Sequence, residues 1–217
     1  MDGLLVDSEP LWFELETQIM ARMGGAWSHA DQQHLVGGPP SRSLRYMLAR
    51  ASRPVPEETV ARWMADGITG LVRRHGVAML PGARELVAEV TAAGVPRALV
   101  TSAHRDLMDT VLETIGVAFD VTVCADDVRR SKPHPEPYLL AAGRLGVHPG
   151  GCVALEDSPN GVASAEAAGC AVIAVPNVAV VPPRPGRVIA RSLRDVDLAR
   201  LRGVAASRGP SAVTNGS

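Results

Sequence analysis

The chain has 217 residues, of which 46% are hydrophobic and 21% are charged, a composition typical of a folded globular protein rather than a disordered one. Its formal net charge of -1 provides no broad basic surface, so we expect no binding to nucleic acid or to an anionic membrane. No apolar run approaches the roughly 18 residues that a membrane helix needs, and we expect a cytoplasmic protein.

Residues 9–76 carry apolar side chains at helical spacing and contain no convincing strand. Groups of glycine and proline interrupt this spacing and divide the segment. The pattern predicts four helices, at about residues 10–23, 31–36, 41–48 and 57–74.

After residue 80 the pattern changes to short apolar strands that alternate with amphipathic helices. The predicted strands lie at residues 97–101, 121–124, 152–155 and 171–175, and the predicted helices at 83–93, 105–115, 136–145 and 162–168. Such alternation indicates a parallel sheet that is covered by helices on both faces. A helical block inserted ahead of such a sheet indicates a cap over the strand ends, where open α/β sheets bind ligands.

The end of the chain is less regular, with a possible edge strand at residues 188–190, a last helix at 197–201, and a stretch from about 207 whose composition predicts a loose tail. We therefore expect an α/β core formed by residues 1–8 and 77–206, a helical cap formed by residues 9–76, and a flexible tail at 207–217.

Hydroxyl groups follow the predicted strand that ends at Thr101. Thr101 and its neighbour Ser102 precede a helix, where a hydroxyl and the following amides can bind a phosphate oxygen. The alternative interpretation is that one of them caps the next helix. Asp2 and Gly3, near the start of the chain, form a pair that is common in surface turns and indicates little by itself.

Lys132 is the only lysine in the chain, and Pro133 and Pro135 hold it in a non-helical loop just before a helix. Every other permanently basic side chain is arginine, which suggests that this position needs a compact ammonium group rather than a planar guanidinium. An ammonium group placed in this way can bind phosphate and carboxylates. A surface lysine in a proline-rich turn remains the alternative.

Adjacent carboxylates, Glu156 and Asp157, end another predicted apolar strand. Buried carboxylates are costly unless their charge is compensated, and a hard divalent cation such as Mg²⁺ is the natural compensation. The alternative is that Asp157 and Ser158 only cap the next helix.

These four segments appear in the order of the motifs of the haloacid dehalogenase superfamily. Residues 2–8 (Asp-Gly-Leu-Leu-Val-Asp-Ser), Thr101, residues 131–133 (Ser-Lys-Pro) and residues 155–161 (Leu-Glu-Asp-Ser-Pro-Asn-Gly) carry the resemblance, which covers residues 1 to about 200. The chain most resembles the branch with a small helical cap, which includes β-phosphoglucomutase-like enzymes and sugar-phosphate phosphatases. The resemblance implies a Rossmann-like parallel sheet core with an inserted α-helical cap.

The resemblance further implies a Mg²⁺-dependent phosphatase that hydrolyses a small phosphorylated metabolite, such as a sugar phosphate, through an aspartyl-phosphate intermediate. It implies that Asp2 is the general acid/base and, through its carbonyl, a metal ligand. Asp157 would be a further metal ligand, and Glu156 a direct or water-mediated one. It implies that Thr101 and Lys132 hold the phosphoryl group, and that the substrate contacts include Gly3, Ser102 and Arg42. A solvated arginine at the start of a helix remains the alternative for Arg42.

In the family the nucleophilic aspartate lies two positions before the general acid, which here predicts a nucleophile immediately before Met1. The apolar strand that precedes this aspartate lies inside the sheet in the family, and its loss would open a central gap. We therefore expect the natural start to lie upstream of Met1.

Two other functions stay open at this point. A phosphomutase of β-phosphoglucomutase type needs the same four motifs and would differ in requiring a sugar bisphosphate. A non-catalytic ligand-binding protein could have kept the site and lost the nucleophile. A haloalkanoate dehalogenase is disfavoured, because Asp2 and the Glu156-Asp157 pair suit an acid and a metal that it would not need.

Overall fold

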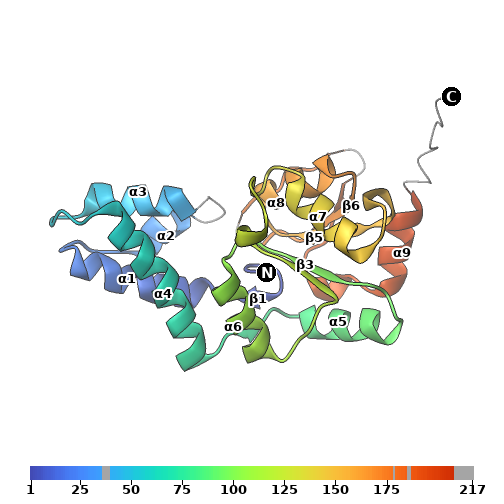
Figure 1. Cartoon of the computed structure of the whole chain (residues 1–217), viewed down its shortest axis with the longest axis horizontal. Coiled ribbons are helices and arrows are strands. Elements are labelled where there is room, and N and C mark those ends of the chain that lie inside the picture. Colours follow the sequence, from blue (N-terminus) through green and yellow to red (C-terminus); the bar gives the residue numbers. More distant parts are fainter. Residues whose placement is uncertain (36–39, 178, 185–186, 208–217) are drawn as a thin grey trace.

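The structure of the chain is a computed structural model that describes residues 1–35, 40–177, 179–184 and 187–207. Four helices gather at one end of the molecule, and the strands with the remaining helices form the other end (Figure 1). Within these described ranges, no helix is long and apolar enough to cross a bilayer. The tail predicted at 207–217 lies outside the described residues except for Ser207, which ends the last helix.

The four predicted helices of the first part are present, with ends that differ by a few residues from those predicted. They are α1 (Glu9–Arg22), α2 (His29–Leu35), α3 (Pro40–Arg50) and α4 (Glu57–His75). Helices α1 and α4 lie side by side. A Cβ atom on Gly67 of α4 would overlap the side chain of Leu15 of α1, so this glycine permits the close approach of the two helices.

A short antiparallel ribbon joins the two ends of this helical segment. Strand β1 (Val6–Asp7) pairs with β2 (Ala78–Met79), with Val6 opposite Met79. The sequence did not predict this ribbon, because two-residue strands leave no alternating pattern. Helix α4 also packs against α6 (Arg105–Ile115), so the helical segment contacts the part of the molecule that contains the parallel strands. The division into core and cap at residues 9–76 stays a prediction.

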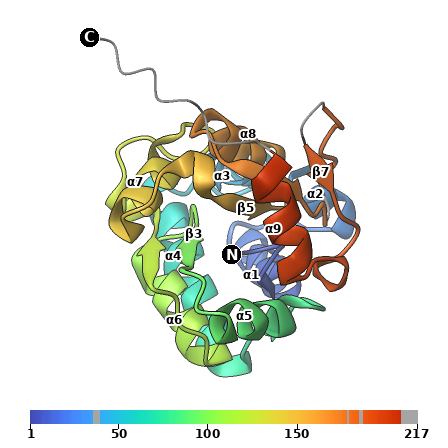
Figure 2. The same cartoon turned by 90° about the vertical axis from the view of Figure 1, so that its right-hand side faces the viewer.

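The parallel strands lie where the sequence predicted them, in two groups. Strand β3 (Ala98–Val100) pairs with β4 (Val121–Val123), and the second group has the order β5 (Val153–Glu156), β6 (Ala171–Ala174), β7 (Val188–Ile189). In the part of the chain that is described, β3 and β5 are not hydrogen-bonded to each other. Met1 is buried, and the start of the chain lies in the middle of this region (Figure 2).

Helices cover the strands, as the alternating pattern predicted. Helix α7 (Glu136–Leu145) packs on β3 and β4, α8 (Pro159–Ala167) on β5 and β6, and α9 (Leu198–Ser207) on the same pair. Helix α5 (Ala83–Ala92) packs against α9. The mixed α/β fold with parallel strands confirms the predicted fold class.

Candidate functional site

The opening loop holds the carboxylate of Asp2 in a fixed place. The Ser8 hydroxyl donates to Asp2 Oδ1 at 2.6 Å, and Ser8 is only 2% exposed. The loop closes on itself, since the amide of Leu5 donates to the Met1 carbonyl at 2.8 Å. Ser8 is the N-cap residue of α1, but its side chain makes no capping hydrogen bond. Its hydroxyl donates to Asp2 instead. Sequence analysis did not find this contact, because a serine just before a helix is ordinary.

Gly3 brings the opening loop against the end of β5. Its φ of 71° is one that glycine adopts without strain, and a Cβ atom at this position would overlap Oδ2 of Asp157. Burial raises the pKa of Asp157, and the nearby Met1 ammonium and Lys132 only partly offset this effect. Asp157 is therefore a half-buried carboxylate whose charge is incompletely compensated by the described residues.

Lys132 links the ends of β3 and β5. Its Nζ donates to the carbonyl of Val100 at 3.0 Å and forms an ion pair with Glu156 Oε1. Both side chains are buried, with 10% of the lysine and 5% of the glutamate exposed. A buried ion pair needs further hydrogen bonds to offset desolvation, and Tyr138 Oη supplies one by donating to the same Oε1. The sequence did not single out Tyr138, since it looked like an ordinary core position of a helix.

Thr101 follows β3 directly and is buried. Its Oγ1 accepts from the amide of Ala103 at 3.1 Å, and Ser102 beside it is exposed. The N-cap of α6 is His104, so neither hydroxyl caps that helix and the capping alternative is wrong. Because Lys132 contacts the carbonyl of Val100, the residue before Thr101, the lysine and the threonine meet at the same strand end.

Arg42 is not brought to these residues by any contact within the described part of the chain. It is exposed on α3, and its Nη2 lies 3.4 Å from His34 Nε2. The residues before it, 36–39, lie outside the described ranges. A role for Arg42 in gripping the substrate stays a prediction.

Carboxylates surround the opening loop. Burial raises the pKa of Glu9, and the charges of Asp2, Asp7 and Asp157 raise it further. Among the described residues, no three His, Cys, Asp or Glu side chains are arranged to hold a metal ion. The oxygen donors nevertheless fit Mg²⁺ in chemistry, because Asp157 is incompletely compensated. Glu156 fits direct ligation less well, since its Oε1 already binds two donors.

Asp157 and Ser158 are adjacent but have different roles, because Ser158 caps a helix and Asp157 faces the opening loop. The Ser158 hydroxyl accepts from the amide of Gly161 at 3.2 Å and caps α8. The capping alternative is therefore correct for Ser158, whereas Asp157 points toward Gly3 of the opening loop.

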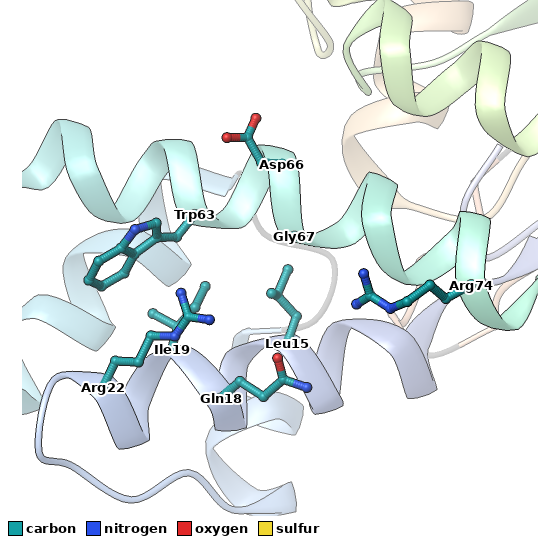
Figure 3. Close-up of a pocket in the computed structure, with 8 residues that line it drawn as sticks. All are labelled: Leu15, Gln18, Ile19, Arg22, Trp63, Asp66, Gly67 and Arg74. Carbon is teal, nitrogen blue, oxygen red and sulfur yellow. The ribbon is translucent and has the colours of Figure 1, made fainter.

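A cavity of about 240 Å³ lies elsewhere, between α1 and α4 (Figure 3). It is lined by Leu15, Gln18, Ile19, Arg22, Trp63, Asp66, Gly67 and Arg74. Its one lining carboxylate, on Asp66, points away from α1 in Figure 3. None of the residues predicted to form the site lines this cavity, so we place the candidate active site at the ends of β3 and β5.

Comparison with known proteins shows which family the chain resembles. The family described as haloacid dehalogenase-like hydrolase matches residues 1–175. Hexitol phosphatase B of Escherichia coli (strain K12) is 36% identical over 186 residues, which cover 81% of this chain and 81% of that protein.

Two solved structures are also similar. CbbY from Rhodobacter sphaeroides in complex with phosphate is 27% identical with a TM-score of 0.80, covering 93% of this chain and 96% of that chain. The β-phosphoglucomutase from Clostridium difficile has a TM-score of 0.74, covering 95% of this chain and 94% of that chain, and at 20% identity it shows the fold alone.

Proposed function

Because the chain belongs to the haloacid dehalogenase-like hydrolases and is a phosphatase of that type, we propose that it hydrolyses a small phosphorylated metabolite of the sugar-phosphate class with Mg²⁺. One observation carries the proposal. Asp2 and Gly3 of the opening loop, Lys132 and the Glu156-Asp157 pair all meet at the ends of β3 and β5. The similarity to a hexitol phosphatase supports a polyol or sugar phosphate as the substrate class.

Asp2 is the general acid/base in this proposal. Its carboxyl group, oriented by the Ser8 hydroxyl, donates its proton to the leaving oxygen of the substrate, and the resulting carboxylate later accepts a proton from the attacking water. Lys132 balances the charge of the phosphoryl group with its ammonium, and Thr101 lies at the same strand end to bind a phosphate oxygen. Gly3 leaves room for the loop to approach Asp157.

The carboxylate of Asp157 and the main-chain carbonyl of Asp2 would hold the Mg²⁺ ion. Glu156 would act through a water molecule, because Lys132 and Tyr138 already bind its Oε1. When bound, Mg²⁺ neutralises charge on a phosphate oxygen and orients the phosphoryl group.

The nucleophile stays a prediction for the position immediately before Met1. Met1 is buried and Gly3 lies against Asp157, so the position before Met1 lies near the proposed metal site. Attack by that carboxylate on phosphorus would give the aspartyl-phosphate intermediate, which water then hydrolyses.

The test is Mg²⁺-dependent release of phosphate from an aryl phosphate and a hexitol phosphate. Two forms are compared, the chain from Met1 and a form extended upstream through the reading frame. We expect the extended form to turn over, and Asp2→Asn and Lys132→Ala to lower its kcat by about 100-fold or more. Asp66→Asn, which changes a carboxylate of the cavity between α1 and α4, should leave kcat unchanged.

Two outcomes would redirect the assignment. If both forms fold and bind phosphate without turnover, the phosphatase proposal fails and the chain is a ligand-binding protein. If turnover requires a sugar bisphosphate and yields an isomeric sugar phosphate, the chain is a phosphomutase.

A further inference from the structure

Tyr138 contacts the Lys132-Glu156 pair in two ways. Its hydroxyl donates to Glu156 Oε1, the same oxygen that accepts from Lys132 Nζ. The face of its ring also lies beside the ammonium, with Nζ 5.2 Å from the ring centroid. One side chain therefore contacts both members of the ion pair, through a hydrogen bond and through a cation–π interaction.

The burial of all three groups makes this contact consequential. As whole residues, Glu156 is 4% exposed and Tyr138 is 9% exposed. If Tyr138 did not donate to it, Glu156 Oε1 could therefore not bind water in its place without a shift in structure. Burial and the Glu156 charge raise the pKa of Tyr138 well above its ordinary value. The hydroxyl of a phenol is protonated at physiological pH, so Tyr138 can donate to Glu156 as the geometry shows.

The carboxylate of Glu156 is confined on its other side as well. A Cβ atom on Gly161 would overlap Oε1 and Oε2 of Glu156, so the carboxylate rests directly against the backbone at the start of α8. Gly161 limits the movement of Glu156 on one side, and the Tyr138 hydroxyl fixes it on the other. The Lys132 ammonium is held in turn between Glu156 Oε1 and the Val100 carbonyl.

We propose that Tyr138 is a positioning residue, which fixes Glu156 with its hydroxyl and Lys132 with its ring so that the ammonium stays at the end of β3. The statement that this ammonium binds the phosphoryl group rests on the proposed function. The geometric part does not, because it concerns only the contacts among Tyr138, Glu156 and Lys132.

Lys132 is the only lysine of the chain, which permits a direct test. Protein made with lysine labelled with carbon-13 at Cε gives a single lysine signal in its nuclear magnetic resonance spectrum. In the wild type we expect this signal to lie away from its unfolded position, with two inequivalent Hε protons, because the side chain is fixed beside an aromatic ring. Tyr138→Phe keeps the ring and removes the hydroxyl, and it should reduce the separation of the two Hε signals by about half or more. Tyr138→Leu also removes the ring and should bring the signal close to its unfolded position.

The chain offers a matched control in Tyr46, its only other tyrosine. Tyr46 also donates to a carboxylate, Asp31 Oδ1 at 2.7 Å, but it does so on α3. Tyr46→Phe should leave the lysine signal unchanged. The proposal is overturned if Tyr138→Phe leaves the signal unchanged while its circular dichroism matches wild type, or if Tyr46→Phe moves the signal equally.

Titration with inorganic phosphate separates this inference from the proposed function. We expect phosphate to shift the Lys132 signal in the wild type and to bind Tyr138→Phe about tenfold more weakly. If phosphate leaves the wild-type signal in place, the proposed function fails, while the response to Tyr138→Phe still decides the positioning role. If phosphate binds both proteins equally, Tyr138 does not position Lys132 for phosphate, and that part of the inference is wrong.

Discussion

The Ser8 hydroxyl and the Asp2 carboxylate are joined by a hydrogen bond of 2.6 Å inside the opening loop. Ser8 is the last residue before α1, and Asp2 is the proposed acid/base. The bond therefore links the residue at the start of the first helix to the proposed acid/base. A hydrogen bond to a charged group is about twice as strong as a neutral one. We infer that the bond sets the direction in which Asp2 presents its proton.

In the form extended upstream, which we expect to be active, Ser8→Ala should lower kcat by about ten- to a hundredfold. The substitution removes a hydrogen bond worth about 1.5–3 kcal/mol. The value of KM should change little, since Ser8 is buried behind Asp2. Steady-state kinetics with an aryl phosphate would measure both. Ser8→Thr keeps the hydroxyl and serves as the control. Equal losses in the two variants would mean that packing, and not the hydrogen bond, is what Ser8 provides.

Gly161→Ala should destabilise the fold by about 1–3 kcal/mol, because the added methyl group overlaps the Glu156 carboxylate and forces it away from Lys132. Denaturant unfolding would measure the change. Gly143→Ala is the matched control, since Gly143 lies in α7 and a Cβ atom there meets no atom within 4 Å. That variant should gain about 0.5–1 kcal/mol from helix propensity. A neutral result for Gly161→Ala would mean that the carboxylate can move aside at no cost.

Patterns that are local in sequence predicted most of the fold. Helices α6 and α7 have the bounds that apolar spacing indicated. Helix α8 begins at Pro159, three residues earlier than predicted, because Ser158 caps it and proline is favoured in the first turn. The prediction relied on the apolar positions, which begin later.

Some residues of the site could be predicted from the sequence, and others could not. Lys132 stood out as the only lysine, held between prolines, and Glu156 with Asp157 stood out as carboxylates at a strand end. Tyr138 and Ser8 did not stand out, because a tyrosine in a helix and a serine before one are ordinary. Their importance comes from tertiary contacts with Glu156 and Asp2, which composition and spacing do not encode.

Lys132→Arg should weaken phosphate binding by about tenfold or more, although it keeps the charge. The ammonium occupies a buried position between the Val100 carbonyl and Glu156 Oε1, and a planar guanidinium is too large to donate to both in the same place. Isothermal titration with inorganic phosphate would measure the affinity. Arg62→Lys on α4, at an exposed position, is the reverse exchange and should have no effect. Wild-type affinity in Lys132→Arg would show that charge alone is required.

We expect Glu16 to make the stability of the protein depend on pH near neutrality. It is 6% exposed on α1, and its Oε2 has no hydrogen-bond partner among the described residues. Burial raises its pKa from 4.5 to about 7; Trp27 lowers the pKa in part, and the Glu9 charge raises it. The folded pKa is above the unfolded one, so the stability that this group contributes is complete below pH 4.5 and is lost as pH rises through about 7.

Glu16→Gln should therefore raise the free energy of unfolding by about 3 kcal/mol at pH 8 and change it little at pH 4.5, because glutamine resembles the protonated acid. Chemical denaturation at a series of pH values would measure the difference. Glu58→Gln, at an exposed position of α4, is the control and should give similar curves to wild type. A gain from Glu16→Gln of equal size at both pH values would show that the side chain acts through packing. In that case, the ionisation of Glu16 would not be what limits the stability of the protein above neutral pH.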